Sequence, residues 1–329
     1  MKRILALTLL TITLWTCPGV YHAAQAAPPS QQSSSDNTFG IGIGIGFMSG
    51  NTLYHISAYD ATGGIESELE FPLKTLLLGL EYGYVGRNAR GQDDLKIGIQ
   101  WFMNIDNGSG KLKDSDWLTD SVDIIEVGAP HPGLDIYSES DITLKANIID
   151  LRASYNFWPS DSLSVGPLGG FLYQNFQFDA SNVHQVGYGP YNTPSYTGSV
   201  SGLVLTYEVT YTIPYLGIHS EMLVSRSFQA FLDLGYSPWA SAEDRDDHVL
   251  RKKVSKAKTK GSAYLAAITA QWDIEDNDFF LIRGQYLEIN TTGTQTQTFY
   301  DGSGDVFTGI NDKITSKQIS ATVLFSHRF

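Results

Sequence analysis

Two short acidic segments carry side chains that can do acid–base chemistry. Asp114 and Asp116 are two residues apart, and Asp246 stands two residues before His248. On an extended strand, residues with this spacing share a face, so each pair would present its side chains together. A carboxylate beside an imidazole orients the ring and stabilises its protonated form. The Asp246–His248 pair can therefore accept a proton from water, while the Asp114–Asp116 pair positions that water from the other side.

This chemistry needs the two pairs to face each other. Four strand-like runs separate them along the chain, so in a closed barrel of ten strands they would stand across the mouth, with room for a peptide between them. No serine or cysteine nucleophile is required. Two other interpretations stay open: acidic loops are often only solvated surface, and a DxD segment with a nearby aspartate also resembles part of a calcium site.

Ten runs of alternating or apolar residues predict the strands that would position these pairs. They span residues 39–47, 75–85, 95–104, 141–158, 163–179, 203–224, 228–239, 262–274, 279–290 and 314–329. No segment beyond the amino-terminal region holds the roughly 18 consecutive apolar residues of a membrane helix. Only a closed barrel reconciles these strands with residence in a membrane. The sequence therefore predicts an all-β fold, a ten-stranded antiparallel transmembrane barrel that extends beyond the outer membrane.

The first and last runs show which face meets lipid. Between Phe39 and Phe47, large apolar residues alternate with glycines, which predicts a lipid-facing side and a bare side toward a crowded interior. The last run, from Ile319 to Phe329, alternates in the same way and stops on an aromatic carboxyl terminus, as closing strands of outer-membrane barrels do. Outer-membrane lipid is therefore the expected partner.

The predicted connections fall into two classes. Short polar turns are expected on the periplasmic side, at residues 86–94, 159–162, 225–227 and 275–278. Longer loops are expected on the outer side, at residues 48–74, 105–140, 180–202, 240–261 and 291–313.

The amino terminus predicts export. Residues 1–26 combine Lys2 and Arg3 with an apolar run and a small-x-small cleavage site, which is typical of a signal peptide. Residues 27–37 predict a flexible lead-in, and residues 38–329 form the barrel. The only cysteine, Cys17, lies in the signal. Removing this segment changes the net charge from −13 to about −15, which argues against nucleic acid as a partner.

The acidic segments also resemble those of the omptin family of outer-membrane aspartyl-type endopeptidases. Asp114-Ser115-Asp116-Trp117 is similar to the family's D-x-D-W. The run Ser237-Pro238-Trp239, followed by Asp244, Asp246 and His248, is similar to its S-G-W and D-x-D-x-H. Further matches are Met48-Ser49-Gly50, Tyr173-Gln174 and Pro214-Tyr215-Leu216-Gly217. The similarity runs from about Phe39 to Phe329.

The resemblance implies roles for individual residues. Asp114 and Asp116 correspond to the family's carboxylate couple, and Asp246 and His248 to its Asp–His couple. Asp244 falls on one of two acidic positions that bind the basic side chain before the scissile bond. The other position falls on Tyr54, which is substrate-binding but not acidic.

The resemblance also implies an active site that faces the outside of the cell and a peptide or protein substrate. With Tyr54 in the pocket, we expect some preference for basic residues, weaker than in the family. His131, in a His-Pro pair, matches a further family position, and a loop-packing role is favoured for it over a catalytic one.

No cofactor and no metal site are expected, since the chain has no HExxH motif and no cysteine after the signal. Lipopolysaccharide is a possible ligand in this family. Gln177 and Thr210 stand at the positions of its usual arginine contacts, so these contacts are absent. Two alternatives stay open: the protein does not depend on lipopolysaccharide, or other outer residues such as Arg251, Lys252 or Lys253 bind it.

Two other functions remain open. One is a non-catalytic barrel of the same ancestry that acts as an adhesin or binding protein. A porin is disfavoured, because side chains largely fill the interior of a ten-stranded barrel.

Overall fold

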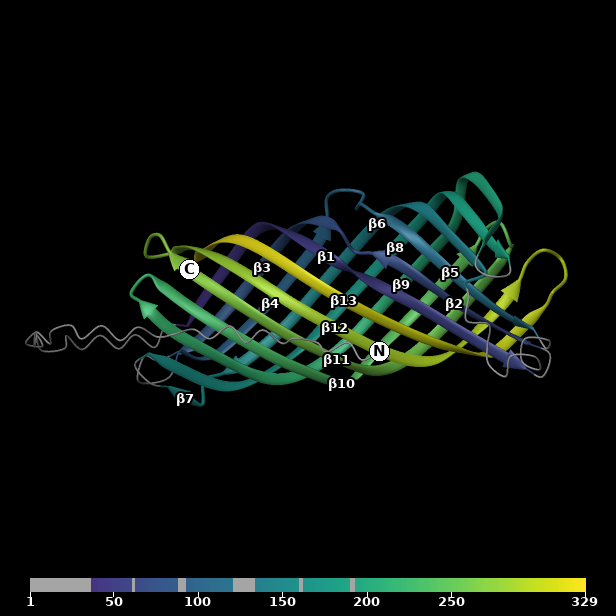
Figure 1. The fold of residues 1–329 in the computed structure, drawn as a ribbon. Coiled ribbons are helices and arrows are strands. Elements are labelled where there is room, and N and C mark those ends of the chain that lie inside the picture. The colour runs from purple at the N-terminus through teal and green to yellow at the C-terminus, as the bar shows by residue number, and fades with distance from the viewer. Residues whose placement is uncertain (1–36, 61–62, 88–92, 121–133, 160–161, 190–192) are drawn as a thin grey trace, which may run out of the picture. The chain divides into compact units, whose positions relative to one another are not determined.

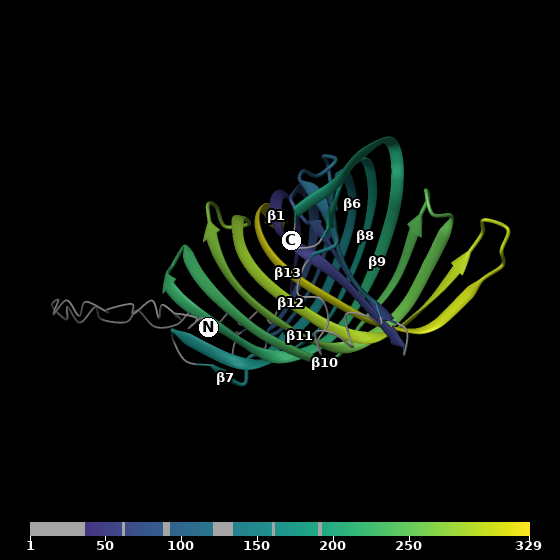
Figure 2. The same cartoon turned by 45° about the vertical axis from the view of Figure 1, so that its right-hand side comes forward.

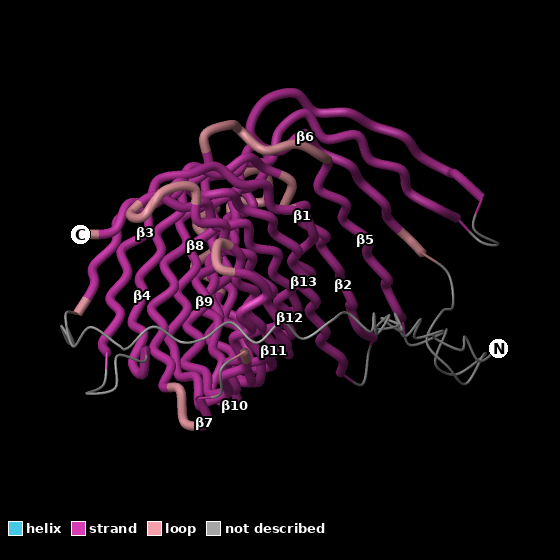
Figure 3. The backbone as a smooth tube through the Cα atoms, turned by 90° about the vertical axis from the view of Figure 1, so that its left-hand side faces the viewer, coloured by secondary structure: helices cyan, strands magenta, loops and turns pink. Residues whose placement is uncertain are grey.

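The computed structural model describes residues 37–60, 63–87, 93–120, 134–159, 162–189 and 193–329, nearly all of them in strands (Figure 3). The strands are β1 (Thr38–Asp60), β2 (Gly63–Pro72), β3 (Thr75–Arg87), β4 (Asp93–Asn104), β5 (Lys111–Asp120), β6 (Ile136–Tyr155), β7 (Trp158–Pro159), β8 (Leu163–Gly189), β9 (Thr193–Ser225), β10 (Phe228–His248), β11 (Lys253–Asp273), β12 (Asp278–Phe299) and β13 (Val306–Arg328). The predicted signal peptide and almost all of the lead-in lie outside the described residues. Among the described residues, no helix is long and apolar enough to span a membrane.

Ten of these strands form a closed antiparallel ring. Its order is β1, β3, β4, β6, β8, β9, β10, β11, β12 and β13, and β13 then pairs with β1. This closing ladder runs from Gly40 opposite Arg328 to Ser57 opposite Asn311. Figure 1 shows β1 between β13 and β3, and Figure 2 shows β10 to β13 side by side. The predicted ten-stranded antiparallel barrel is confirmed.

The outer half of the ring differs from the prediction. Residues 48–74 and 105–140 were expected to be loops, but they contain the ends of β1 and β6 and two further strands. β2 pairs with β1 and β5, and β5 pairs with β6, so these two strands close the ring above β3 and β4. The other three predicted outer loops are also mostly strand. Their alternation is harder to recognise because outside lipid both faces of a strand can be polar.

Successive side chains of β1 point alternately to the outside and the inside of the ring, as the sequence predicts. On β1, Ile41, Ile43 and Ile45 are 54%, 55% and 63% exposed. Gly44, between them, faces inward, where an added Cβ would lie 2.0 Å from the carbonyl oxygen of Val323. The exposed apolar band therefore faces lipid, and glycine is required where strands β1 and β13 approach closely.

Side chains cross the interior of the ring. Gln174 on β8 and Gln318 on β13 are on opposite walls, and their amides exchange hydrogen bonds of 2.9 Å. Higher up, the hydroxyl of Tyr211 on β9 donates to Thr52 on β1 at 3.3 Å. The interior is thus bridged below the outer mouth.

Candidate active site at the outer mouth

The first acidic pair lies on β5. Asp114 and Asp116 are on the inner face of this strand, opposite Leu69 and Ser67 of β2. Asp116 is only 4% exposed. The hydroxyl of Ser67 donates to Oδ1 of Asp114 over a long distance of 3.4 Å. The two carboxylates share a face, as the i, i+2 spacing predicts.

The second pair ends β10. Nε2 of His248 lies 2.7 Å from Oδ2 of Asp246. The Asp246 side chain is 1% exposed and that of His248 is 14% exposed. The contact is a close approach of the two groups rather than a hydrogen bond of ordinary geometry, since neither oxygen of Asp246 has a hydrogen-bond partner among the described residues. The other ring nitrogen, Nδ1, is left to accept a proton.

Two basic residues link the two pairs. Nη2 of Arg251, in the β10–β11 turn, lies 4.0 Å from Oδ2 of Asp116. Lys253, at the start of β11, is 7% exposed and interacts electrostatically with Asp246, Asp116 and Asp114. Burial lowers the pKa of Lys253, and the neighbouring carboxylates oppose that effect. Carboxylates of both pairs therefore act on the same ammonium group, that of Lys253.

The charge of Asp114 depends on its neighbours. Burial and then the Asp116 carboxylate raise the pKa of Asp114 to about 7, with a smaller contribution from Asp246, while Arg251 opposes the shift. Asp114 therefore changes its charge near neutral pH.

Asp244 lies beside the second pair, two residues before Asp246. Its Oδ1 accepts a hydrogen bond of 2.9 Å from the backbone N–H of Ala257. Its Oδ2 is buried and forms no hydrogen bond of ordinary geometry within the described residues, although the Tyr207 hydroxyl lies close enough to lower the pKa of Asp244. Burial and the Asp246 carboxylate raise the pKa of Asp244 to about 7.

Tyr54 is buried below these carboxylates. It is 1% exposed, and its hydroxyl donates to Oε1 of Gln295 at 2.6 Å. Its ring lies 5.4 Å from that of Tyr207, which stacks on Phe71 at 4.3 Å. Burial and then Asp246, Asp244 and Asp312 raise the pKa of Tyr54. Tyr54 is thus part of an aromatic floor formed by Tyr54, Phe71, Phe178 and Tyr207.

Sequence reasoning missed two residues of this region, Lys253 as an inner residue and Asp312. Asp312 on β13 is 3% exposed, and neither of its carboxylate oxygens has a hydrogen-bond partner among the described residues. Burial, then Asp244 and Asp246, raise the pKa of Asp312 to about 8. Asp312 lies two residues from both Ile310 and Ile314, so the three side chains share one face of the strand. This spacing could have revealed that Asp312 faces inward.

The remaining predictions concern the outer wall. Gln177 donates weakly to Glu208 at 3.4 Å, and Thr210 accepts from Asn175 at 2.9 Å. The acidic residue Glu208 therefore lies beside Gln177, one of the two residues at the positions of the family's usual arginine contacts. Of the basic residues named as replacements, Lys253 faces inward and Arg251 approaches Asp116. His131 lies outside the described residues.

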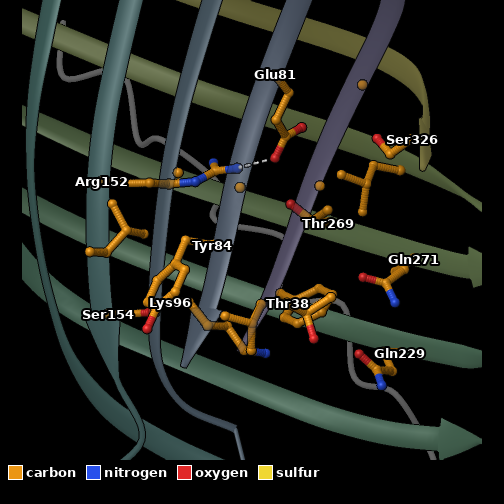
Figure 4. A pocket seen from close by; sticks show the side chains of 18 of the residues that line it. Thr38, Glu81, Tyr84, Lys96, Arg152, Ser154, Gln229, Thr269, Gln271 and Ser326 are labelled. Atoms are coloured by element: carbon orange, nitrogen blue, oxygen red, sulfur yellow. Dashed lines mark hydrogen bonds and ion pairs between the residues drawn. The ribbon is translucent and has the colours of Figure 1, made fainter. Parts of the chain in front are cut away.

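A separate cavity of about 260 Å³ lies inside the ring near its periplasmic end (Figure 4). Nη2 of Arg152 lies 3.5 Å from Glu81 there, and Nδ1 of His219 lies 2.6 Å from Asp233. No predicted site residue lines this cavity, so it is distinct from the outer mouth.

The chain is similar to known outer-membrane proteins over almost its whole length. The model of the omptin family matches residues 35–329. The plasminogen activator of Yersinia pestis is 25% identical over 307 residues, which cover 90% of this chain and 91% of that protein. The crystal structure of the outer membrane protease OmpT from Escherichia coli covers 90% of this chain and 98% of its own, with a TM-score of 0.73 and 16% identity. This last likeness supports the fold.

Proposed function

This chain belongs to the omptin family and is a protease of the bacterial outer membrane, and we propose that it hydrolyses peptide bonds by direct attack of water held between two acidic pairs. Asp246 and His248 activate the water from one side. Asp114 and Asp116 accept its hydrogen bonds from the other side. The single observation that carries this proposal is the 2.7 Å contact between the buried Asp246 carboxylate and Nε2 of His248.

The reaction follows from the free nitrogen of this imidazole. As the oxygen of water bonds to the scissile carbonyl carbon, Nδ1 of His248 takes the proton that water loses. Asp246 stabilises the resulting imidazolium. When the tetrahedral intermediate collapses, the carbon–nitrogen bond breaks, and His248 returns the proton to the leaving amine. No covalent bond to the protein forms at any step.

The substrate is a peptide or an exposed protein segment that reaches the outer mouth. Asp244 lies beside the proposed catalytic pair and carries a carboxylate oxygen without a hydrogen bond of ordinary geometry within the described residues. A carboxylate of this kind favours a basic residue in the substrate, because a cation would satisfy it. We therefore propose cleavage next to basic residues.

Water attack and covalent catalysis differ in their products when a competing nucleophile is present. The refolded protein would cleave a fluorogenic peptide library with and without hydroxylamine, and mass spectrometry would identify the new carboxyl ends. Water attack predicts that the protein gains no mass when the reaction is stopped with acid during turnover. An acyl adduct on the protein, together with hydroxamates formed in proportion to hydroxylamine, would indicate an acyl-enzyme and would exclude the proposed mechanism.

A further inference from the structure

Asp312 is a buried carboxylate that the proposed mechanism does not use. It lies on β13, opposite Ile56 of β1 and Gly293 of β12. Both of its carboxylate oxygens lack hydrogen-bond partners within the described residues, although it is 3% exposed. A buried carboxylate without a partner is costly, so natural proteins rarely keep one unless it binds something.

Asp244 on β10 also has a buried carboxylate oxygen without a hydrogen bond of ordinary geometry. Asp244 is 7% exposed, and this oxygen is its Oδ2. Among the charged neighbours that raise the pKa of Asp312, Asp244 has the largest effect. The two carboxylates are therefore close enough to interact. Three buried oxygens of these two residues therefore lack a hydrogen bond of ordinary geometry within the described residues, although the Tyr207 hydroxyl lies close enough to Asp244 to lower its pKa.

The strands between them carry short side chains at this level. Gly293 of β12 stands opposite both Asp312 and Thr259 of β11. Ala257, the next inward residue of β11, stands opposite Asp244. Apart from Gln295 of β12, which stands opposite Ala257 and accepts a hydrogen bond from Tyr54, these inward residues are no longer than threonine.

The floor of this region is aromatic. Tyr54 interacts electrostatically with Asp244 and Asp312, and so does Tyr207. The Tyr54 hydroxyl is held by Gln295, so the ring is fixed in place. Carboxylates beside aromatic faces bind a guanidinium or ammonium group through charge, hydrogen bonds and cation–π attraction.

We propose that Asp312 and Asp244 together form the pocket that binds a basic side chain of the substrate, with Tyr54 and Tyr207 as its floor. The inference rests on the proposed peptidase function and extends it. Asp312 supplies from β13 the second negative charge that Tyr54 does not supply from β1. The preference for arginine or lysine should then be strong, in contrast to the weaker preference that the sequence predicts.

The test compares substrates rather than overall activity. Wild type, Asp312→Asn and Asp244→Asn would cleave matched peptides that carry either arginine or its neutral isostere citrulline next to the cleaved bond. We expect Asp312→Asn to lower the ratio of kcat/KM for arginine over citrulline by roughly tenfold or more, with little change for citrulline. Asp305→Asn is the control, since it removes an exposed carboxylate from the β12–β13 turn. It should leave the ratio unchanged.

The outcomes separate the two proposals. An unchanged ratio in Asp312→Asn, or an equal loss for both peptides, would overturn the role of Asp312 while leaving the peptidase intact. If wild type cleaves neither peptide, nor any other, the proposed function fails first.

A binding measurement keeps the inference testable without turnover. Agmatine, which carries a guanidinium group, would be titrated calorimetrically into each folded variant near pH 7. Wild type and Asp305→Asn should bind it, and Asp312→Asn should bind it at least about tenfold more weakly. Because Asp312 and Asp244 are partly protonated at this pH, binding to wild type should release protons, seen as a dependence of the heat on the buffer. Equal binding by Asp312→Asn would contradict the proposal.

Discussion

Lys253 stands directly opposite His248 in the ladder between β11 and β10. Directly opposed residues of antiparallel strands project their side chains to the same face. A buried ammonium group therefore lies beside the imidazole and also interacts with Asp246, Asp116 and Asp114. It offsets part of the negative charge that the two acidic pairs concentrate at the outer mouth.

Replacing Lys253 with methionine should therefore shift the pH dependence of cleavage. Without the ammonium group the ionised carboxylates are less stabilised, so the rise of kcat/KM with pH should move upward by roughly one pH unit. The pH profile of peptide cleavage measures this directly. Lys256→Met is the control, because Lys256 lies on the same strand but is exposed. If both variants keep the wild-type profile, Lys253 does not interact with the carboxylates of the proposed active site.

The Asp114 carboxyl should govern the activity near neutral pH. Burial and Asp116 raise its pKa to about 7, so the ionised form that accepts a hydrogen bond from water appears as the pH rises through this value. Asp114→Asn should lower kcat roughly a hundredfold and remove the step near pH 7. Full activity, or an unaltered step, would argue against a role for Asp114 in holding water. Asp301→Asn, on the exposed β12–β13 turn, should behave as wild type.

Asp312 should reduce stability at high pH. Its folded-state pKa of about 8 lies above the ordinary value of 3.8, so the folded chain holds this proton more tightly than the unfolded chain does. The free energy of unfolding should therefore fall as the pH rises from about 4 to 8. Asp312→Asn should be more stable than wild type at pH 9 by roughly 1–3 kcal/mol, with a much smaller difference at pH 4. Urea unfolding in detergent micelles at both values tests the sign. A variant that is less stable at pH 9 would show that the charged carboxylate is satisfied in the fold.

The amide pair that bridges the interior should behave as a unit. Gln174→Leu leaves the buried carbonyl oxygen of Gln318 without its partner, while the Gln318 nitrogen keeps its bond to Ser316, and should lower the free energy of unfolding by roughly 1–3 kcal/mol. Changing both residues to leucine should restore part of this loss, because no buried polar group is then left unpaired. The same unfolding measurement applies. Strictly additive losses would mean that the two amides do not interact.

Alternation along the sequence was sufficient to predict the membrane part of the fold. Runs such as 39–47 and 314–329 place apolar residues on one face only, which is the pattern that a wall between lipid and a packed interior requires. Ten strands and the short turns between them followed from it. The outer strands β2 and β5 were not predicted, because outside lipid neither face of a strand must be apolar. A segment such as Lys111–Asp120 therefore resembles a polar loop.

The sequence predicts only those parts of the candidate site that lie on a single strand. Asp114 with Asp116, and Asp246 with His248, are neighbours on a single strand, so their i, i+2 spacing places them together. Asp312 approaches Asp244 only through the register of the successive strands β10, β11, β12 and β13, which leaves two strands between the two residues. A contact of that kind depends on strand register, which the sequence does not state locally.

The most direct test of the water-attack mechanism is cleavage of a random-peptide library by the refolded wild type and His248→Ala, with and without lipopolysaccharide. Matching circular dichroism spectra would establish that both proteins are folded. We predict that wild type cleaves peptides and that His248→Ala is slower by roughly a hundredfold or more. Cleavage at the wild-type rate by folded His248→Ala would contradict the mechanism. A folded wild type that cleaves nothing in either condition would instead point to a binding barrel of the same ancestry.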